Sequence, residues 1–254
     1  MKKVKRILIS QPEPTEKSPY DELIEKYDIE IVFKPFIHVE SISLQDFRKQ
    51  RIEILSHTAI VFTARTAVDH FFHICDSLRI TVPESMKYFC MSEAIAFYLQ
   101  KYIVYRKRKI FFGNGSLASL IATVNVPKHR VDKFFMVLAD SFKPEVPRAF
   151  ERAKLKITKG VLYRTVASDL TELDIKSYDV IAFFSPAEIK SLQNNFPDFE
   201  QDETLMATFG PATAKAVKAA KYRLDIEAPK PDTPSMSKAL DVFLAANPPQ
   251  EITV

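Results

Sequence analysis

The chain has 254 residues, of which 46% are hydrophobic and 27% charged, a composition typical of a globular protein of one large or two modest domains. Its net charge of +4 permits an acidic ligand but is too small to indicate nucleic-acid binding. The four glycines form neither a Gly-Lys-Ser/Thr phosphate loop nor a dinucleotide-binding fingerprint, so both of these nucleotide sites are excluded.

The chain also lacks the sequence features of secreted and membrane proteins. The basic N-terminus is followed by an apolar run too short for a signal peptide, and no segment is long enough to span a bilayer. Cys75 and Cys90 fall in apolar patterns, which predicts buried free thiols. We therefore expect a cytoplasmic protein with neither a membrane nor a nucleic-acid partner.

The first part of the chain predicts two strands, a helix between them and an alternating segment. In chain order, the predicted elements are a strand over 4–9, a helix over 18–26 capped by Ser18-Pro19, a strand over 29–36, a half-exposed ribbon over 37–44 and a helix over 45–55. The ribbon alternates apolar and polar residues, which indicates that only one of its faces is covered.

Four short apolar runs follow a common pattern, because each ends at a polar or turn element and is followed by a helical pattern. They cover 59–62, 88–91, 180–184 and 205–209. Short uncharged runs are typical of strands buried on both faces of a parallel sheet. The helices would begin at the carboxyl end of such a sheet, where free backbone amides favour anions. Two such pairs early and two late indicate two α/β domains, with one larger sheet as the alternative.

The middle of the chain supplies the remaining elements. Strands are predicted over 110–112 and 133–138, helices over 116–122 and 147–154, and a second alternating ribbon over 157–166. The two alternating ribbons flank the middle domain and could pair with each other. They would then form a two-stranded hinge.

Small polar residues at the strand ends are the candidate binding residues. They are Thr63, Ser92, Ser141, Ser185 and Thr213. Each one alone would most simply cap the helix that follows. Together they could line a cleft that binds a polyanion through hydroxyls and backbone amides.

Two other kinds of site have little support. His70 and His73 share a helix face with Asp69 close by, but that helix also carries a core face and no second group of donors completes a metal site. No Gly-x-Ser-x-Gly motif exists, and Pro186 directly after Ser185 argues against acyl transfer. We expect no metal and no cofactor.

Four stretches together carry a resemblance to a known family. They are Phe62-Thr63-Ala64-Arg65-Thr66-Ala67-Val68, Leu162-Tyr163-Arg164-Thr165-Val166, Phe183-Phe184-Ser185-Pro186 and Ala207-Thr208-Phe209-Gly210-Pro211-Ala212-Thr213-Ala214-Lys215-Ala216. In order and spacing they resemble the motifs of uroporphyrinogen-III synthases, and Gly210-Pro211-Ala212-Thr213-Ala214 is the most specific. Met91-Ser92-Glu93-Ala94 departs from the family's Gly-x-x-Thr-Ala, and a glycine usual near residue 220 is absent.

The resemblance implies an architecture of two parallel-sheet α/β domains joined by a two-stranded antiparallel ribbon. Domain 1 would consist of residues 1–36 plus 168–254, and domain 2 of residues 45–160. The hinge ribbon would consist of 37–44 plus 161–167, with the active-site cleft between the domains.

The resemblance also implies a reaction, which needs no cofactor. The substrate would be hydroxymethylbilane, a linear tetrapyrrole polycarboxylate. The enzyme, a cyclising lyase, would remove its terminal hydroxyl as water, invert ring D and close the macrocycle to uroporphyrinogen III. The family's self-contained cleft implies a monomer, with a transient contact to the enzyme that makes hydroxymethylbilane left open.

The residue roles follow from the matched motifs. Tyr163 would be the catalytic residue, as proton donor or as a group that orients the leaving water; a tyrosine packed between the domains is the alternative. Substrate contacts would come from Thr63, Ala64, Arg65, Ser92, Ser141, Ser185, Pro186, Gly210, Pro211 and Thr213. Arg65 is the strongest of these, because a cation at a strand's carboxyl end suits a carboxylate ligand.

Two other classes of function remain compatible with the sequence. A non-catalytic protein with two domains on a hinge could close on a small polycarboxylate. A partnered component of tetrapyrrole metabolism could act only within a complex. Turnover by the purified chain alone separates the enzyme from both.

Overall fold

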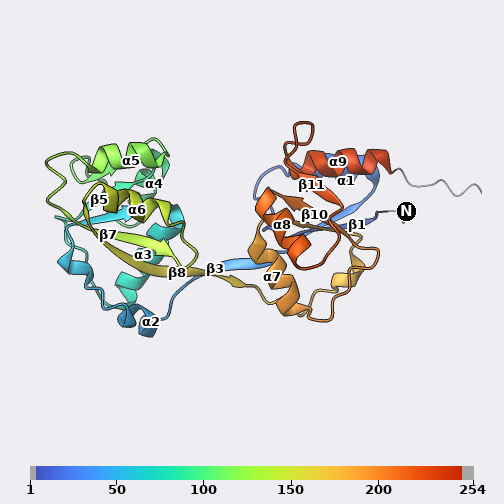
Figure 1. The fold of residues 1–254 in the computed structure, drawn as a ribbon, viewed down its shortest axis with the longest axis horizontal. Coiled ribbons are helices and arrows are strands. Elements are labelled where there is room, and N and C mark those ends of the chain that lie inside the picture. Colours follow the sequence, from blue (N-terminus) through green and yellow to red (C-terminus); the bar gives the residue numbers. More distant parts are fainter. Residues whose placement is uncertain (1–3, 248–254) are drawn as a thin grey trace, which may run out of the picture. The chain divides into compact units, whose positions relative to one another are not determined.

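The structure is a computed structural model that describes residues 4–247 (Figure 1). These residues form two separate sheets and two compact units. Unit 1 holds the described residues up to His38 and from Val166 onward, and unit 2 holds Val39–Thr165. The alternative of one larger sheet is therefore wrong.

Unit 1 is built on a five-stranded parallel sheet in the order β11-β10-β9-β1-β2. Its strands are β1 (Arg6–Ile9), β2 (Glu30–Phe33), β9 (Val180–Phe183), β10 (Leu205–Phe209) and β11 (Ile226–Ala228). Its helices are α1 (Asp21–Tyr27), α7 (Pro186–Asn195), α8 (Pro211–Ala219) and α9 (Met236–Ala246), with a 3₁₀ turn η3 (Ile175–Ser177). Helices α1 and α9 cover one face, and α7 and α8 cover the other (Figure 1). All four residues of β9 are consequently buried.

Unit 2 is built on a six-stranded sheet in the order β3-β8-β7-β4-β5-β6. Its strands are β3 (Ile37–Ser41), β4 (Ala59–Phe62), β5 (Lys87–Cys90), β6 (Ile110–Phe112), β7 (Lys133–Ala139) and β8 (Lys156–Ala167). Its helical elements are α2 (Leu44–Lys49), η1 (Ile54–Ser56), α3 (Arg65–Ser77), α4 (Glu93–Tyr98), η2 (Leu99–Lys101), α5 (Leu117–Val124) and α6 (Glu145–Arg152). Helices α3 and α4 pack on one face, and α5 and α6 on the other.

Strand β7 shows how the sequence assigns side chains to these two faces. Phe134 and Met136 join the core under α5 and α6, whereas Phe135 and Val137 join the core under α3 and α4. This period of two is the geometry of a strand covered on both sides.

Cys75 and Cys90 are buried free thiols, as predicted, and burial raises the pKa of each to about 12.

The second alternating ribbon is part of a sheet, which the sequence pattern does not predict. Strand β8 pairs in parallel with β7 from Lys156 onward, so much of this segment is an inner strand of unit 2. Gly160 explains the fit, because a Cβ there would lie 2.4 Å from a ring carbon of Phe135. The two ribbons do pair with each other, as predicted, since β3 is the neighbour of β8.

A β-bulge interrupts β8 just before Tyr163. Leu138 is paired with Val161, but the next residue, Ala139, is paired with Tyr163. Leu162 is the extra residue, and its side chain and that of Tyr163 therefore join the same core under α3 and α4. Bulges re-aim a side chain in this way and are frequent beside active sites.

Several helix ends differ from the prediction for local reasons. Helix α1 begins at Asp21 rather than Ser18, because the Ser18 hydroxyl accepts the Tyr20 N–H and closes a turn instead of capping the helix. Helix α2 ends at Lys49, and the Gln50 side chain instead makes two hydrogen bonds to the backbone of Val161. Helix α3 begins at Arg65, three residues after the end of β4, where the sequence predicts a helical pattern. Among residues 4–247, no helix has the length and apolarity needed to cross a bilayer.

A buried cluster of titratable residues lies at the amino edge of the unit 2 sheet, where β4, β5 and β7 begin. Asp132 accepts hydrogen bonds from Lys87 Nζ at 2.8 Å and Thr58 Oγ1 at 2.8 Å. His129 is buried edge-on against Phe89 and Phe111, with ring centroids 4.9 and 4.4 Å away. Burial, reinforced by Lys87 and Lys128 and opposed by Asp132, lowers the pKa of His129 below its usual value.

We expect His129→Phe to weaken the acid sensitivity of folding. Below about pH 6.5 the unfolded histidine takes up a proton that the folded one resists, so the free energy of unfolding falls as pH drops from there toward the folded pKa. Phenylalanine keeps the ring contacts and removes this contribution. Urea denaturation at pH 7, 6 and 5 measures the decline, with His73→Phe on the exposed face of α3 as the control. If the free energy of unfolding declines equally in the wild type and His129→Phe, His129 is not the source of the acid sensitivity.

Candidate active site

The predicted small polar residues lie at the carboxyl edges of the two sheets. In unit 2, Thr63 follows β4, Ser92 follows β5 and Ser141 follows β7, and the three strands are neighbours in the order β7-β4-β5. In unit 1, Ser185 follows β9 and Thr213 lies beyond its neighbour β10. Since parallel strands end at one edge, each unit gathers its own set of these residues, at the edge where open α/β sheets bind ligands.

The carboxyl edge of unit 2 also carries the two residues with the clearest chemistry. Tyr163 is level with Ala139, the last residue of β7. Arg65 is the first residue of α3, which begins just after the adjacent strand β4. Its guanidinium is exposed, lies 5.6 Å from the centroid of the Tyr98 ring, and forms no ion pair with the residues that the structure describes. It is thus a cation available to a ligand.

Tyr163 packs inside unit 2 rather than projecting from an alternating ribbon. The bulge at Leu162 breaks the alternation of β8, so the Tyr163 side chain joins the same core as that of Leu162. Its ring stacks on that of His70 with centroids 5.0 Å apart and planes 13° apart, and 9% of the residue remains exposed. Burial raises the pKa of the phenol above its usual value. The phenol of Tyr163 is therefore protonated at physiological pH.

The histidine and aspartate that the sequence offers as metal ligands have other partners. His70 Nδ1 is hydrogen-bonded to Ser41 Oγ at 2.6 Å. Asp69 accepts hydrogen bonds from Tyr98 at 2.9 Å, from Lys101 at 2.9 Å and from Tyr102. Burial alone would raise the pKa of Asp69, but these donors hold it below its usual value. Residues 4–247 contain no group of three side chains placed to hold a metal ion.

The carboxyl edge of unit 1 presents two helix N-termini, each with proline at the start, as predicted. Pro186 begins α7 and Pro211 begins α8. Gly210 precedes α8 at φ 92°, a left-handed backbone angle that glycine adopts without strain. Thr213, in the first turn of α8, is buried. The free backbone amides of these two first turns suit carboxylates.

A buried glutamate, not anticipated from the sequence, fixes the turn at Ser185. The Glu188 carboxylate accepts hydrogen bonds from the Ser10 hydroxyl at 2.7 Å, the Phe184 N–H at 2.6 Å and the Ser185 N–H at 3.2 Å. Burial nevertheless raises the pKa of Glu188 above its usual value. The signal was present in the sequence, because a serine followed three residues later by glutamate is typical of a helix start.

The helix-cap alternative applies to Ser185 but not to Thr63, Ser92 or Ser141. Ser185 is the N-cap residue of α7 and stands in a capping-box arrangement with Glu188, although its buried Oγ makes no hydrogen bond of normal geometry within residues 4–247. Thr63 precedes the N-cap position, which Ala64 occupies, and Ser92 sits at an N-cap position without making a cap bond. Ser141 lies in an exposed turn. The hydroxyls of Thr63, Ser92 and Ser141 are thus not committed to capping.

A cavity of about 500 Å³ in unit 2 includes one predicted contact. It is lined by Ser92, Glu93, Ala94, Phe112, Gly113, Asn114 and Ser119, at the ends of β5 and β6. Gly113 allows the close approach here, because a Cβ would lie 2.9 Å from the backbone nitrogen of Leu120. The carboxylate of Glu93 makes this cavity a poor site for a polycarboxylate, which weakens the case for Ser92.

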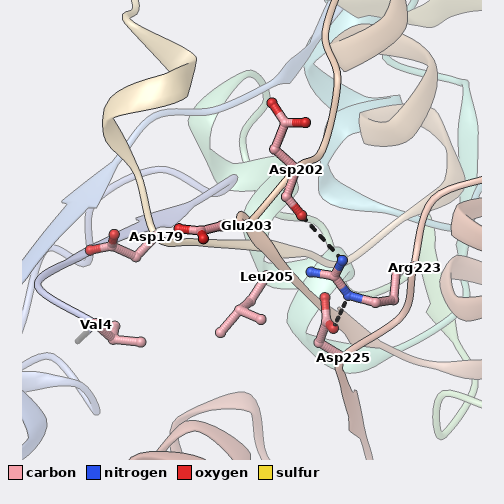
Figure 2. Close-up of a pocket in the computed structure, with 7 residues that line it drawn as sticks. All are labelled: Val4, Asp179, Asp202, Glu203, Leu205, Arg223 and Asp225. Atoms are coloured by element: carbon pink, nitrogen blue, oxygen red, sulfur yellow. Dashed lines mark hydrogen bonds and ion pairs between the residues drawn. The ribbon is translucent and has the colours of Figure 1, made fainter. Parts of the chain in front are cut away.

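A second cavity, of about 410 Å³, lies in unit 1, at the edge of the sheet opposite to the one where Ser185 and Thr213 lie (Figure 2). Its lining residues are Val4, Asp179, Asp202, Glu203, Leu205, Arg223 and Asp225. Several of them stand directly before β1, β9, β10 and β11, which places the cavity at the amino edge. Arg223 donates to Asp225 at 2.6 Å and to the Asp202 carbonyl at 3.1 Å, so its charge is already engaged (Figure 2). The remaining acidic lining would repel a carboxylate ligand.

Comparisons with known proteins agree with this geometry. A family model described as uroporphyrinogen-III synthase HemD matches residues 18–238. The solved uroporphyrinogen-III synthetase of Helicobacter pylori 26695 is similar with a TM-score of 0.57 and 14% identity, covering 95% of this chain and 99% of that one. A mutant uroporphyrinogen III synthase of the extremely thermophilic bacterium Thermus thermophilus is similar with a TM-score of 0.50 and 14% identity, covering 96% and 98%. No curated protein sequence gives a significant match.

The two kinds of similarity support different statements. At 14% identity, the solved structures show a shared mixed α/β fold with parallel sheets. The family model supports a family assignment as well, because its match spans most of the chain and includes every predicted site residue. The chain accordingly belongs to the uroporphyrinogen-III synthase family, whose members are cyclising lyases of tetrapyrrole biosynthesis.

Proposed function

We propose that the chain converts hydroxymethylbilane to uroporphyrinogen III, with Tyr163 as its catalytic residue. The observation that supports these roles most directly is the position of Tyr163 and Arg65 on one sheet edge. Tyr163 is level with the end of β7, and Arg65 starts the helix that follows the adjacent strand β4. A neutral phenol and an exposed cation are the groups that a hydroxyl-bearing polycarboxylate requires.

Tyr163 would act on the leaving hydroxyl. As the C–O bond breaks, the phenol donates a hydrogen bond or a proton to the departing oxygen, which leaves as water. The electrons of the pyrrole stabilise the resulting azafulvene cation. Ring D attacks this cation through the α-carbon that already bears its bridge to ring C, and that bridge bond then breaks to leave a second azafulvene cation on ring C. The free α-carbon of ring D attacks this second cation, so the macrocycle closes with ring D inverted, and the proton lost from that carbon restores the phenol. The raised pKa keeps the phenol protonated before the reaction.

The other residues would hold the carboxylates. Arg65 offers a charge-assisted pair, and the first turns of α7 and α8 offer backbone amides. We propose contacts at Thr63, Ala64, Arg65, Ser92, Ser141, Ser185, Pro186, Gly210, Pro211 and Thr213, with Ser92 and Ser141 the weakest. Holding a flexible bilane so that its two ends meet would itself supply much of the rate.

The proposal extends to the organisation of the protein. Residues 37–44 and 161–167, where the chain passes between the units, would form the hinge between domain 1 and domain 2. We propose a cytoplasmic monomer that works without a cofactor, consistent with its two buried free thiols. A transient contact with the enzyme that makes hydroxymethylbilane would limit spontaneous closure of the bilane.

Complementation tests this function in a cell. A bacterial strain that lacks its own uroporphyrinogen-III synthase is expected to regain haem synthesis when it expresses this chain, and to grow poorly with Tyr163→Phe. Immunoblotting confirms equal amounts of both proteins. Absence of growth with abundant folded wild-type protein would overturn the proposal and favour the non-catalytic binding protein.

A further inference from the structure

Three residues from three elements converge beside the bulge of β8. Ser41 ends β3, His70 lies on α3 and Tyr163 lies on β8. Ser41 Oγ is hydrogen-bonded to His70 Nδ1 at 2.6 Å, and the imidazole lies nearly parallel to the phenol ring, 13° apart with centroids at 5.0 Å. None of the sequence motifs discussed above includes this arrangement.

The backbone alone does not fix the phenol hydroxyl. Tyr163 is held to the sheet through its pairing with Ala139, and its carbonyl accepts the Asp140 N–H at 2.9 Å. These bonds set the Cα position, whereas the orientation of the ring depends on the side chains packed around it in the core under α3 and α4. Within that core, His70 is the residue whose ring stacks on the phenol, and offset-stacked rings prefer parallel planes.

His70 is itself fixed from the opposite side. Its hydrogen bond to Ser41 sets the rotation of the imidazole, and β3 is the neighbour of β8 in the sheet. Burial lowers the pKa of His70, with Asp69 acting against this and His73 with it, so the ring is neutral at pH 7. A neutral imidazole stacks on Tyr163 without drawing water into the core.

We propose that His70, held by Ser41, is a positioning residue that sets the ring plane of Tyr163 and thereby the location of its hydroxyl in the reaction. This inference rests on the proposed catalytic role of Tyr163. Misplacement of a catalytic group by about 1 Å can cost on the order of 100-fold in rate. Loss of the stack should therefore lower kcat and leave KM, which reports carboxylate binding, within about twofold.

The experiment measures kcat and KM for type III porphyrinogen formation in paired variants. His70→Ala removes the stack, His70→Phe keeps it without the Ser41 bond, and His70→Asn keeps a polar atom without the stack. Each is made in the wild type and in Tyr163→Phe, with His73→Ala on the exposed side of α3 as the matched control. Circular dichroism and urea denaturation identify any variant that fails to fold.

In the wild-type background, we expect His70→Ala and His70→Asn to lower kcat about tenfold. The His70→Phe variant, which retains the stack, should keep most of the wild-type kcat. In the Tyr163→Phe background, His70→Ala should change kcat by less than about twofold, because the hydroxyl that it positions is already gone. If His70→Ala does not fold, His70→Phe compared with His70→Asn supplies the same contrast.

Two outcomes would overturn the inference in distinguishable ways. A slow Tyr163→Phe together with an equal His70→Ala effect in both backgrounds would show that His70 does not act through Tyr163, and would leave the proposed function intact. A Tyr163→Phe variant as fast as wild type would remove the catalytic role of Tyr163 and this inference with it.

Discussion

Tyr163→Phe is expected to lower kcat by about 100-fold, the low end of what general acid catalysis contributes, with KM little changed. Phenylalanine keeps the ring that stacks on His70, so the variant removes only the hydroxyl. Activity should persist, because the carboxylate contacts still fold the bilane. Initial rates of type III formation from freshly generated hydroxymethylbilane provide the measurement.

Tyr88→Phe is the matched control for this variant. Tyr88 is a buried tyrosine of the same unit, stacked on Phe62 with centroids 6.3 Å apart, and burial raises its pKa as it does for Tyr163. It stands on β5, distant from the carboxyl end of β7, and should keep wild-type kcat. A Tyr163→Phe rate within about twofold of wild type would contradict the catalytic assignment.

Arg65→Ala is expected to raise KM at least tenfold while kcat changes less. A charge-assisted hydrogen bond contributes about 1.5 to 3 kcal/mol, and about 1.4 kcal/mol is a factor of ten in binding. The residue is exposed, and its one specific contact within residues 4–247 is with the Tyr98 ring, so its loss should cost the fold little. Arg65→Lys keeps the charge without the bidentate fork, so its KM should lie between those of the wild type and Arg65→Ala.

Arg106→Ala controls for the loss of positive charge from the same unit. Arg106 pairs with Glu84 at 2.8 Å, in the segment that precedes β6, and takes no part in the proposed site. KM should be unchanged in this variant. If Arg65→Ala and Arg106→Ala have the same KM, Arg65 does not hold a substrate carboxylate.

The parts of the fold that sequence predicts well are those with local signals. The runs that became β9 and β10 are short and apolar, and Pro186 and Pro211 mark the helix starts that follow them. A strand buried on both faces tolerates no charge, so its composition alone identifies it. The helix ends were less accurate, because side chains such as Gln50 bond to distant backbone instead of extending the helix.

The alternating ribbons show where local signals fail. Alternation indicates a half-covered strand, but β8 is paired inside the sheet over much of its length. Its neighbour β7 lies earlier in the chain and across an intervening helix, so no local pattern records the pairing. The bulge at Leu162 then reverses the side on which Tyr163 lies, and one inserted residue is enough to do so.

The sequence supplies candidate residues for the site but not the interactions among them. Motifs identify Arg65, Ser185 and Tyr163 one at a time. The contacts of Tyr163 with His70 and of His70 with Ser41 join segments far apart in the chain, and they depend on the β3–β8 pairing. The sequence presents His70 only as a possible metal ligand, because it does not show that the imidazole ring faces a tyrosine.

The central claim is that this chain directs ring closure, and the ratio of porphyrin isomers tests it most directly. Hydroxymethylbilane is generated in place, the purified chain is added, and the oxidised products are separated into type I and type III isomers. Without an enzyme, the bilane closes to the type I isomer with no ring inversion. We predict a shift to type III that grows with the amount of protein, whereas type I alone from folded protein would contradict the account.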